Sequence, residues 1–240
     1  MSEDINVSDN SVNAVDRPNE THKIIVTIDG PAGAGKSTVA RAAAKRIGLP
    51  YLDTGALYRG VAWRMNKDGI NADEGSLMSE VLTTFKLEQR NGKLFADGVD
   101  ITSHIRTPEI DRLVSVYAAR PEVRNALVDL QRSQAVNGLV ADGRDMGTVV
   151  FPEAELKIFL TASAEERARR RCDERIARGE KNVNYDEVLR QVIERDRYDM
   201  EREIAPLRPA QGCIILDTTD MSIEEVIDAV TSLAKEFMRQ

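Results

Sequence analysis

The segment 24–38, IIVTIDGPAGAGKST, constrains the fold of this 240-residue chain more than any other. A run of β-branched residues precedes a glycine-rich turn, and an Ala/Val-rich stretch follows it. The segment therefore predicts a buried strand, a loop and the first turn of a helix. Gly30, Gly35, Lys36 and Ser37 fit the phosphate-binding pattern G-x-x-x-x-G-K-S/T. The alternative, a glycine-rich turn with an incidental Lys-Ser pair, is disfavoured by the strand and helix on either side.

The residue types in this loop suit the binding of phosphate. Glycines let backbone N–H groups approach phosphate oxygens, and the helix that follows adds its free N–H groups and the positive end of its dipole. Lys36 supplies a mobile positive charge for the outer phosphates, and Ser37 offers a hydroxyl to Mg²⁺. The loop thus predicts a binding site for a nucleoside triphosphate and a divalent cation.

Composition narrows the class of protein further. The formal net charge is −7, which argues against a nucleic-acid binder held by a basic surface. Cys172 and Cys213 form no C-x-x-C pair or framework, as is typical of a reducing compartment. The chain has neither an apolar run of membrane length nor the basic-then-apolar start of a signal peptide. We therefore expect a cytoplasmic protein without a membrane or nucleic-acid partner.

Apolar strands alternate with helices along most of the chain. This rhythm predicts an α/β fold, a P-loop NTPase-like parallel sheet with helices on both faces. The expected strands are 24–28, 49–53, 139–142, 156–160 and 213–217. The expected helices are 37–47, 54–67, 108–117, 121–136, 167–179, 185–203 and 222–238.

Two segments depart from this rhythm. Residues 1–22 are polar and acidic and are expected to form a disordered tail, which leaves one domain over 23–240. Residues 70–107 are expected to be β-rich, with a hairpin turn at Asn91-Gly92 and a second turn at Asp97-Gly98. Together with the two Pro-started helices that follow, they predict a small β/α insertion over about 70–137.

Local signals predict how two helices begin. Thr54 is expected to be the N-cap of the helix 54–67. Ser163 and Glu166 have the spacing of a capping box at the start of the arginine-rich helix that runs toward Gly179.

Ligands of open parallel sheets sit at the carboxyl ends of the strands, and charged residues gather near those ends here. Arg167 and Arg171 share a helix face, and so do Arg195, Asp199 and Arg202. Such sets are often solvated, salt-bridged surfaces. Beside a phosphate-binding loop we favour a role in phosphate binding instead. No N-K-x-D guanine signature is present.

Several motifs resemble those of bacterial cytidylate kinases. They are GPAGAGKST at 30–38, DTGALYR at 53–59, ADGRDMGTVVFP at 141–152, ERD at 194–196 and APL at 205–207. The resemblance covers about residues 23–238. The strand end D-G-F-P-R expected of an adenylate kinase is absent. Thr54 stands where we would expect serine, but it keeps the hydroxyl.

The resemblance implies a P-loop nucleoside-monophosphate kinase with a core, a monophosphate-binding insertion and a helical lid over about 163–183. It implies transfer of a phosphoryl group from ATP to CMP or dCMP, with Mg²⁺, in a protein expected to be a monomer. Two alternatives stay open: a nucleotide-binding regulator without turnover, and a kinase for another monophosphate.

The resemblance also assigns residues, position by position. The residues expected to bind ATP are Gly30, Pro31, Ala32, Gly33, Ala34, Gly35, Lys36, Ser37 and Thr38. Those expected to bind CMP are Thr54, Arg59, Arg144 and Arg202 on the phosphate, Ser115, Arg124 and Asp145 on cytosine, and Arg195 and Asp199 on the sugar. The expected catalytic set is Lys36, Arg144, Arg167, Arg171 and Arg202, with Arg167 and Arg171 neutralising the transferred group.

Two roles remain with alternatives. Asp142, at a buried strand end, is the best candidate beside Ser37 to orient Mg²⁺, through water. Asp145 can accept a hydrogen bond from the amino group of cytosine. Alternatively, it pairs only with a nearby arginine and steadies the loop.

Overall fold

The central element is a five-stranded parallel sheet with the order β2-β6-β1-β7-β8. The computed structural model describes residues 23–239, so the expected tail 1–22 lies outside the described residues. The strands are β1 (Ile25–Asp29), β2 (Tyr51–Asp53), β6 (Leu139–Gly143), β7 (Leu156–Thr161) and β8 (Ile214–Asp217). The predicted parallel α/β sheet is confirmed, with the strand that precedes the glycine-rich loop at its centre.

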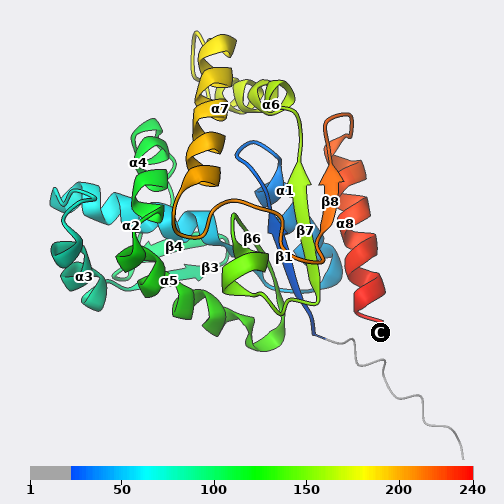
Figure 1. The fold of residues 1–240 in the computed structure, drawn as a ribbon, viewed down its shortest axis with the longest axis horizontal. Helices are drawn as coiled ribbons and strands as arrows, with labels where there is room; N and C mark the ends of the chain where they lie inside the picture. The colour runs from blue at the N-terminus through cyan, green and yellow to red at the C-terminus, as the bar shows by residue number, and fades with distance from the viewer. Residues whose placement is uncertain (1–22, 240) are drawn as a thin grey trace, which may run out of the picture.

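Helices cover both faces of this sheet. On one face, α1 (Lys36–Ile47) and α8 (Ile223–Phe237) share an apolar cluster with β1 and β7. On the other, the cluster is built from α2 (Thr54–Asp68), α4 (Pro108–Ala118) and α5 (Pro121–Ser133). The strand β6 serves both, since Val140 points into the first cluster and Leu139 and Ala141 into the second. The helices α6 (Ala164–Ala177) and α7 (Tyr185–Glu201) lie beyond the carboxyl end of β7 (Figure 1).

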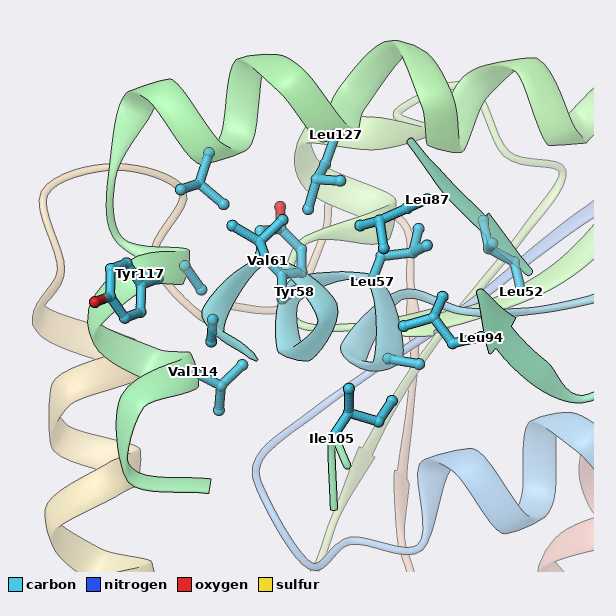
Figure 2. Packing of buried hydrophobic residues seen from close by; sticks show 14 of the residues in the cluster. Leu52, Leu57, Tyr58, Val61, Leu87, Leu94, Ile105, Val114, Tyr117 and Leu127 are labelled. Atoms are coloured by element: carbon cyan, nitrogen blue, oxygen red, sulfur yellow. The ribbon is translucent and has the colours of Figure 1, made fainter. Parts of the chain in front are cut away.

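The β-rich insertion forms a second, antiparallel sheet of β3 (Leu87–Arg90), β4 (Lys93–Ala96) and β5 (Val99–Asp100). The predicted hairpin is confirmed: Asn91 and Gly92 both have positive φ, 51° and 73°. The sheet packs against α2 through leucines of β3 and β4 (Figure 2). Gly60 of α2 permits this contact, because a Cβ there would lie 2.8 Å from Leu94 Cδ2.

Three local predictions were wrong in whole or in part. Asp53, not Thr54, caps α2, because the strand ends at Asp53 and its side chain accepts a hydrogen bond from Ala56 N. Ser163 caps α6 as predicted, since its Oγ accepts from Glu166 N, but the capping box is only half formed. The Glu166 carboxylate accepts from Arg169 and Arg170, and the Ser163 backbone N–H donates to Thr219 Oγ1 instead.

The third error lies in the insertion, where residues 70–107 contain the helix α3 (Gly75–Thr84). Only Met78 of α3 is buried, so its sequence carries a weak amphipathic signal. The remaining short elements are the 3₁₀ turn η1 (Gln134–Asn137) and the π-helical turn η2 (Met146–Val150), which follows β6. The boundaries of the insertion and the lid stay predictions.

The backbone of the glycine-rich loop requires its glycines. Gly30 has φ of 147°, and a Cβ there would lie 2.0 Å from the Leu160 carbonyl oxygen. Gly35 precedes α1 with φ of 83°, and no side chain caps the first turn. The first N–H groups of α1 are therefore available to a ligand, as an anion-binding loop needs.

Candidate active site

A cavity of about 1090 Å³ lies at the carboxyl ends of the strands. It runs from the glycine-rich loop to a helical end between α2, α4 and α5, where Tyr58, Ser115, Arg124 and Asp145 line it. Basic side chains outnumber acidic ones along its wall. All the site residues predicted from sequence line it, except Gly30, Pro31 and Arg167.

At the loop end, the Lys36 side chain is folded against its own loop. Lys36 Nζ donates a hydrogen bond to the Pro31 carbonyl at 2.7 Å. Burial, aided by the charge of Arg144, lowers the pKa of Lys36 well below its usual range. An anionic ligand would stabilise the Lys36 ammonium, because this group is poorly solvated and lies near other positive charges. Phosphate oxygens would supply the negative charge.

Ser37 and Asp142 meet beside this lysine. Ser37 Oγ donates to Asp142 Oδ2 and Tyr51 OH donates to Asp142 Oδ1, both at 2.7 Å. Burial and the neighbouring Asp53 raise the pKa of Asp142. A hydroxyl beside a carboxylate suits Mg²⁺, which usually takes one or two protein ligands and completes its shell with water and phosphate. No cluster of three His, Cys, Asp or Glu side chains that could hold a metal occurs within residues 23–239.

The helical end contains a buried ion pair between Arg124 of α5 and Asp145, which follows β6. Burial raises the pKa of Asp145, against the opposing effects of Arg124 and Arg202. Arg202 Nη2 lies 3.9 Å from Asp145 Oδ1, and the Arg124 guanidinium lies over the Tyr58 ring at 5.7 Å. Tyr58 belongs to the apolar cluster around α2 and also lines the cavity.

Between the two ends lies a cluster of arginines. Arg144 pairs with Asp199 at 2.9 Å. Among the described residues no carboxylate lies within ion-pair distance of Arg195, and its Nε has no hydrogen-bond partner. Burial and the nearby Arg144 and Arg59 lower the pKa of Arg195 to about 9, so the side chain stays charged near neutral pH. This arginine cluster can therefore bind an anion through the charged Arg195 side chain.

Arg167 lies behind the glycine-rich loop rather than in the cavity. Its Nη1 donates to the Ala32 carbonyl at 3.1 Å and its Nε to the Ala162 carbonyl at 2.9 Å. It also pairs with the Asp196 carboxylate at 2.6 Å, and its side chain is only 7% exposed. Arg167 therefore supports the glycine-rich loop from the side away from the cavity. Its guanidinium N–H groups are used in these contacts and point away from a bound substrate.

Three acidic or phenolic side chains at the site were missed in the sequence. Asp29 accepts hydrogen bonds from Met146 N and Gly147 N, which join the end of β1 to the loop that carries Asp145. Tyr51 holds Asp142, and Asp111 pairs with arginines of two other elements. A signal existed for both Asp29 and Tyr51: Asp29 directly follows the predicted strand 24–28, and Tyr51 lies in the predicted strand 49–53. Asp111 gave none beyond its place in a helix.

The parallel sheet, the loop at the end of its central strand and the arginine-lined cavity define a P-loop kinase fold. The family "Cytidylate kinase" matches residues 26–236. The cytidylate kinase of Desulfitobacterium hafniense (strain Y51) is 50% identical over 213 residues, which cover 87% of this chain and 91% of that protein. The cytidylate kinase of Carboxydothermus hydrogenoformans is 49% identical over 207 residues, 84% and 93% of the two chains. The chain belongs to the cytidylate kinase family, as the motifs predicted.

Proposed function

We propose that this protein transfers the γ-phosphoryl group of ATP to CMP or dCMP and releases ADP with CDP or dCDP. One observation carries the proposal: a single cavity joins a phosphate-binding loop to a second anion-binding region that ends in a buried Arg–Asp pair. A phosphotransferase needs both regions, because donor and acceptor phosphates must meet in one water-poor space. None of the helices within 23–239 is long and apolar enough to cross a bilayer.

The donor ATP binds along residues 30–38. Backbone N–H groups of the loop and of the first turn of α1 hold its phosphates, and Lys36 leaves the Pro31 carbonyl to meet the outer ones. Mg²⁺, held by Ser37 and, through water, by Asp142, would offset the charge of the phosphate oxygens. Tyr51 keeps the Asp142 carboxylate turned toward Ser37.

The acceptor CMP binds toward the helical end. Thr54, Arg59, Arg144 and Arg202 hold its phosphate. Arg195 and Asp199 hold the sugar, and cytosine meets Ser115, Arg124 and Asp145, where the carboxylate accepts from the amino group.

Transfer then depends on position and charge rather than on a covalent intermediate. The two phosphates meet in line near Lys36, Arg144, Arg171 and Arg202, which spread the charge of the transferring group. Arg167 serves this step through the loop it supports. We assign no general base. The lid, over about 163–183, closes when both substrates are bound and keeps water out.

A coupled assay for ADP, with and without CMP, separates this function from that of a nucleotide-binding regulator. We expect ADP release to depend on CMP and on Mg²⁺. Binding of ATP with no CMP-dependent ADP release would support the regulator. We further propose a monomer in the cytoplasm, and light scattering after size exclusion tests the oligomeric state.

A further inference from the structure

The carboxylate of Asp111, in the first turn of α4, joins two arginines from different parts of the fold. Asp111 Oδ1 accepts from Arg59 Nη2 at 3.0 Å and from Nε at 3.3 Å, on α2. Asp111 Oδ2 accepts from Arg171 Nη2 at 2.9 Å, on α6. All three side chains line the cavity and are only about one-fifth exposed, at 22%, 19% and 23%. A single carboxylate thus bridges α2, α4 and α6.

The bridge leaves each arginine able to bind a further anion. A guanidinium carries five N–H donors in a planar fork, and Asp111 takes only the Nε–Nη2 edge of Arg59 and one nitrogen of Arg171. Arg59 Nη1 has a long contact of 3.4 Å to the Gly55 carbonyl. Asp111 can therefore stay in place while the remaining donors meet a phosphate.

The surrounding charges explain why a carboxylate is needed at this point. Arg144, Arg59 and Arg171 all lower the pKa of Arg195, so the positive charges lie close enough to repel one another. Burial alone would raise the pKa of Asp111, but Arg59 and Arg171 outweigh it and hold the pKa below its usual range. Asp111 is therefore ionised at neutral pH and offsets this repulsion before any substrate binds.

We propose that Asp111 is a positioning residue for phosphoryl transfer: it holds Arg59 and Arg171 together so that both face the meeting point of the two phosphates. This inference rests on the proposed function, in which Arg59 binds the acceptor phosphate and Arg171 the transferring group. Asp111 itself touches neither reacting atom. It acts by fixing the arginine of α6 relative to the arginine of α2.

Asp111→Asn tests the link, because the amide keeps the size of the side chain and removes its charge. We expect the KM for CMP to rise about 10-fold and kcat to fall about 10-fold, since a small misplacement of a binding group is costly. The KM for ATP should stay within about twofold, because Asp111 does not contact the glycine-rich loop. The matched control is Glu109→Gln, an exposed acid in the same turn of α4, which should change none of these values.

A loss of folded protein would lower kcat alone, so the rise in the KM for CMP distinguishes positioning from simple instability. Asp111→Glu should recover part of the loss, because it restores the charge. Unchanged KM and kcat in Asp111→Asn would overturn the proposal. An equal loss in Glu109→Gln would also overturn it.

Hydrogen exchange on the ligand-free proteins tests the bridge without any turnover. In Asp111→Asn, amides of residues 171–177 should exchange about threefold faster or more than in Glu109→Gln, because α6 has lost its link to α4. Equal exchange would contradict the bridge even if the wild type were active. If the wild-type protein does not phosphorylate CMP, the proposed function is refuted. The exchange experiment would still show whether Asp111 links α6 to α4.

Discussion

Arg124 and Asp145 form a buried ion pair at the helical end of the cavity, with side chains 8% and 2% exposed. This pairing is what the simpler interpretation of Asp145 requires. It leaves a role in base recognition open, because Asp145 Oδ2 meets Arg124 while Oδ1 lies 3.9 Å from Arg202. An ionised carboxylate accepts several hydrogen bonds, so one from cytosine fits beside Arg124.

The first prediction therefore concerns the choice of base. We expect Asp145→Ala to reduce kcat/KM for CMP far more than for UMP, because uracil presents a carbonyl oxygen where cytosine presents an amino donor. The ratio of the two efficiencies is independent of the folded fraction, which matters because the variant leaves Arg124 buried without its partner. Asp145→Asn serves as a second variant of the same size. An unchanged ratio in both would show that Asp145 only steadies the loop.

The second prediction concerns the lysine of the glycine-rich loop. Lys36→Ala should fold normally, because the replaced side chain is a buried amino group whose pKa burial already lowers. The variant should lose about 10²-fold or more in kcat. Lys235→Ala, an exposed lysine on α8, is the control and should behave as wild type. Steady-state rates at saturating ATP, with a melting curve for each variant, give the answer. Near-wild-type turnover of Lys36→Ala would remove Lys36 from the catalytic set.

The third prediction separates two arginines of α6. Arg167→Ala should lower the free energy of unfolding by about 3–5 kcal/mol, because it leaves Asp196 without its partner and the loop carbonyl of Ala32 without its donor. Arg169→Ala removes a side chain that is 60% exposed, so it should cost no more than about 1 kcal/mol. Urea unfolding of both variants measures this. Equal losses in the free energy of unfolding would show that the buried contacts of Arg167 stabilise the fold no more than the exposed contacts of Arg169.

The fourth prediction is a pH dependence. Burial raises the pKa of Asp29 in the folded protein from 3.8 to about 6. The folded state therefore binds more protons than the unfolded state between these values, and this contribution to stability is present below pH 4 and lost as pH rises through 6. The stability of wild type relative to Asp29→Asn should thus fall by up to about 3 kcal/mol between pH 4 and pH 7. Urea unfolding across this range tests it, and a difference that is constant or grows with pH would contradict it.

The sequence predicted the sheet because its strands are short apolar runs that end at polar or glycine residues. The hairpin was equally clear, since Asn91-Gly92 suits a turn with two positive φ angles. The sequence did not predict the helix α3, because α3 buries only Met78 and its apolar pattern is therefore weak. At the start of α2, neighbouring Asp53 and Thr54 are both good capping residues, and only the end of the strand decides between them.

The site residues were recognisable by type, but their pairings were not. Asp111 and Arg171 are 60 positions apart, and Arg124 and Asp145 are 21 apart, so only the folded chain brings them together. Arg167 shows the same limit. It shares a helix with Arg171, yet its side chain turns to the back of the loop while that of Arg171 turns to the cavity.

The proposed choice of base is tested most directly by the kcat/KM of the wild type with CMP, dCMP, UMP and AMP at saturating ATP and Mg²⁺. The arrangement of Arg124 and Asp145 predicts turnover of CMP or dCMP with an efficiency about 10²-fold or more above that of UMP and AMP. An efficiency with UMP or AMP that equals or exceeds that with both cytidine nucleotides would contradict the proposed function.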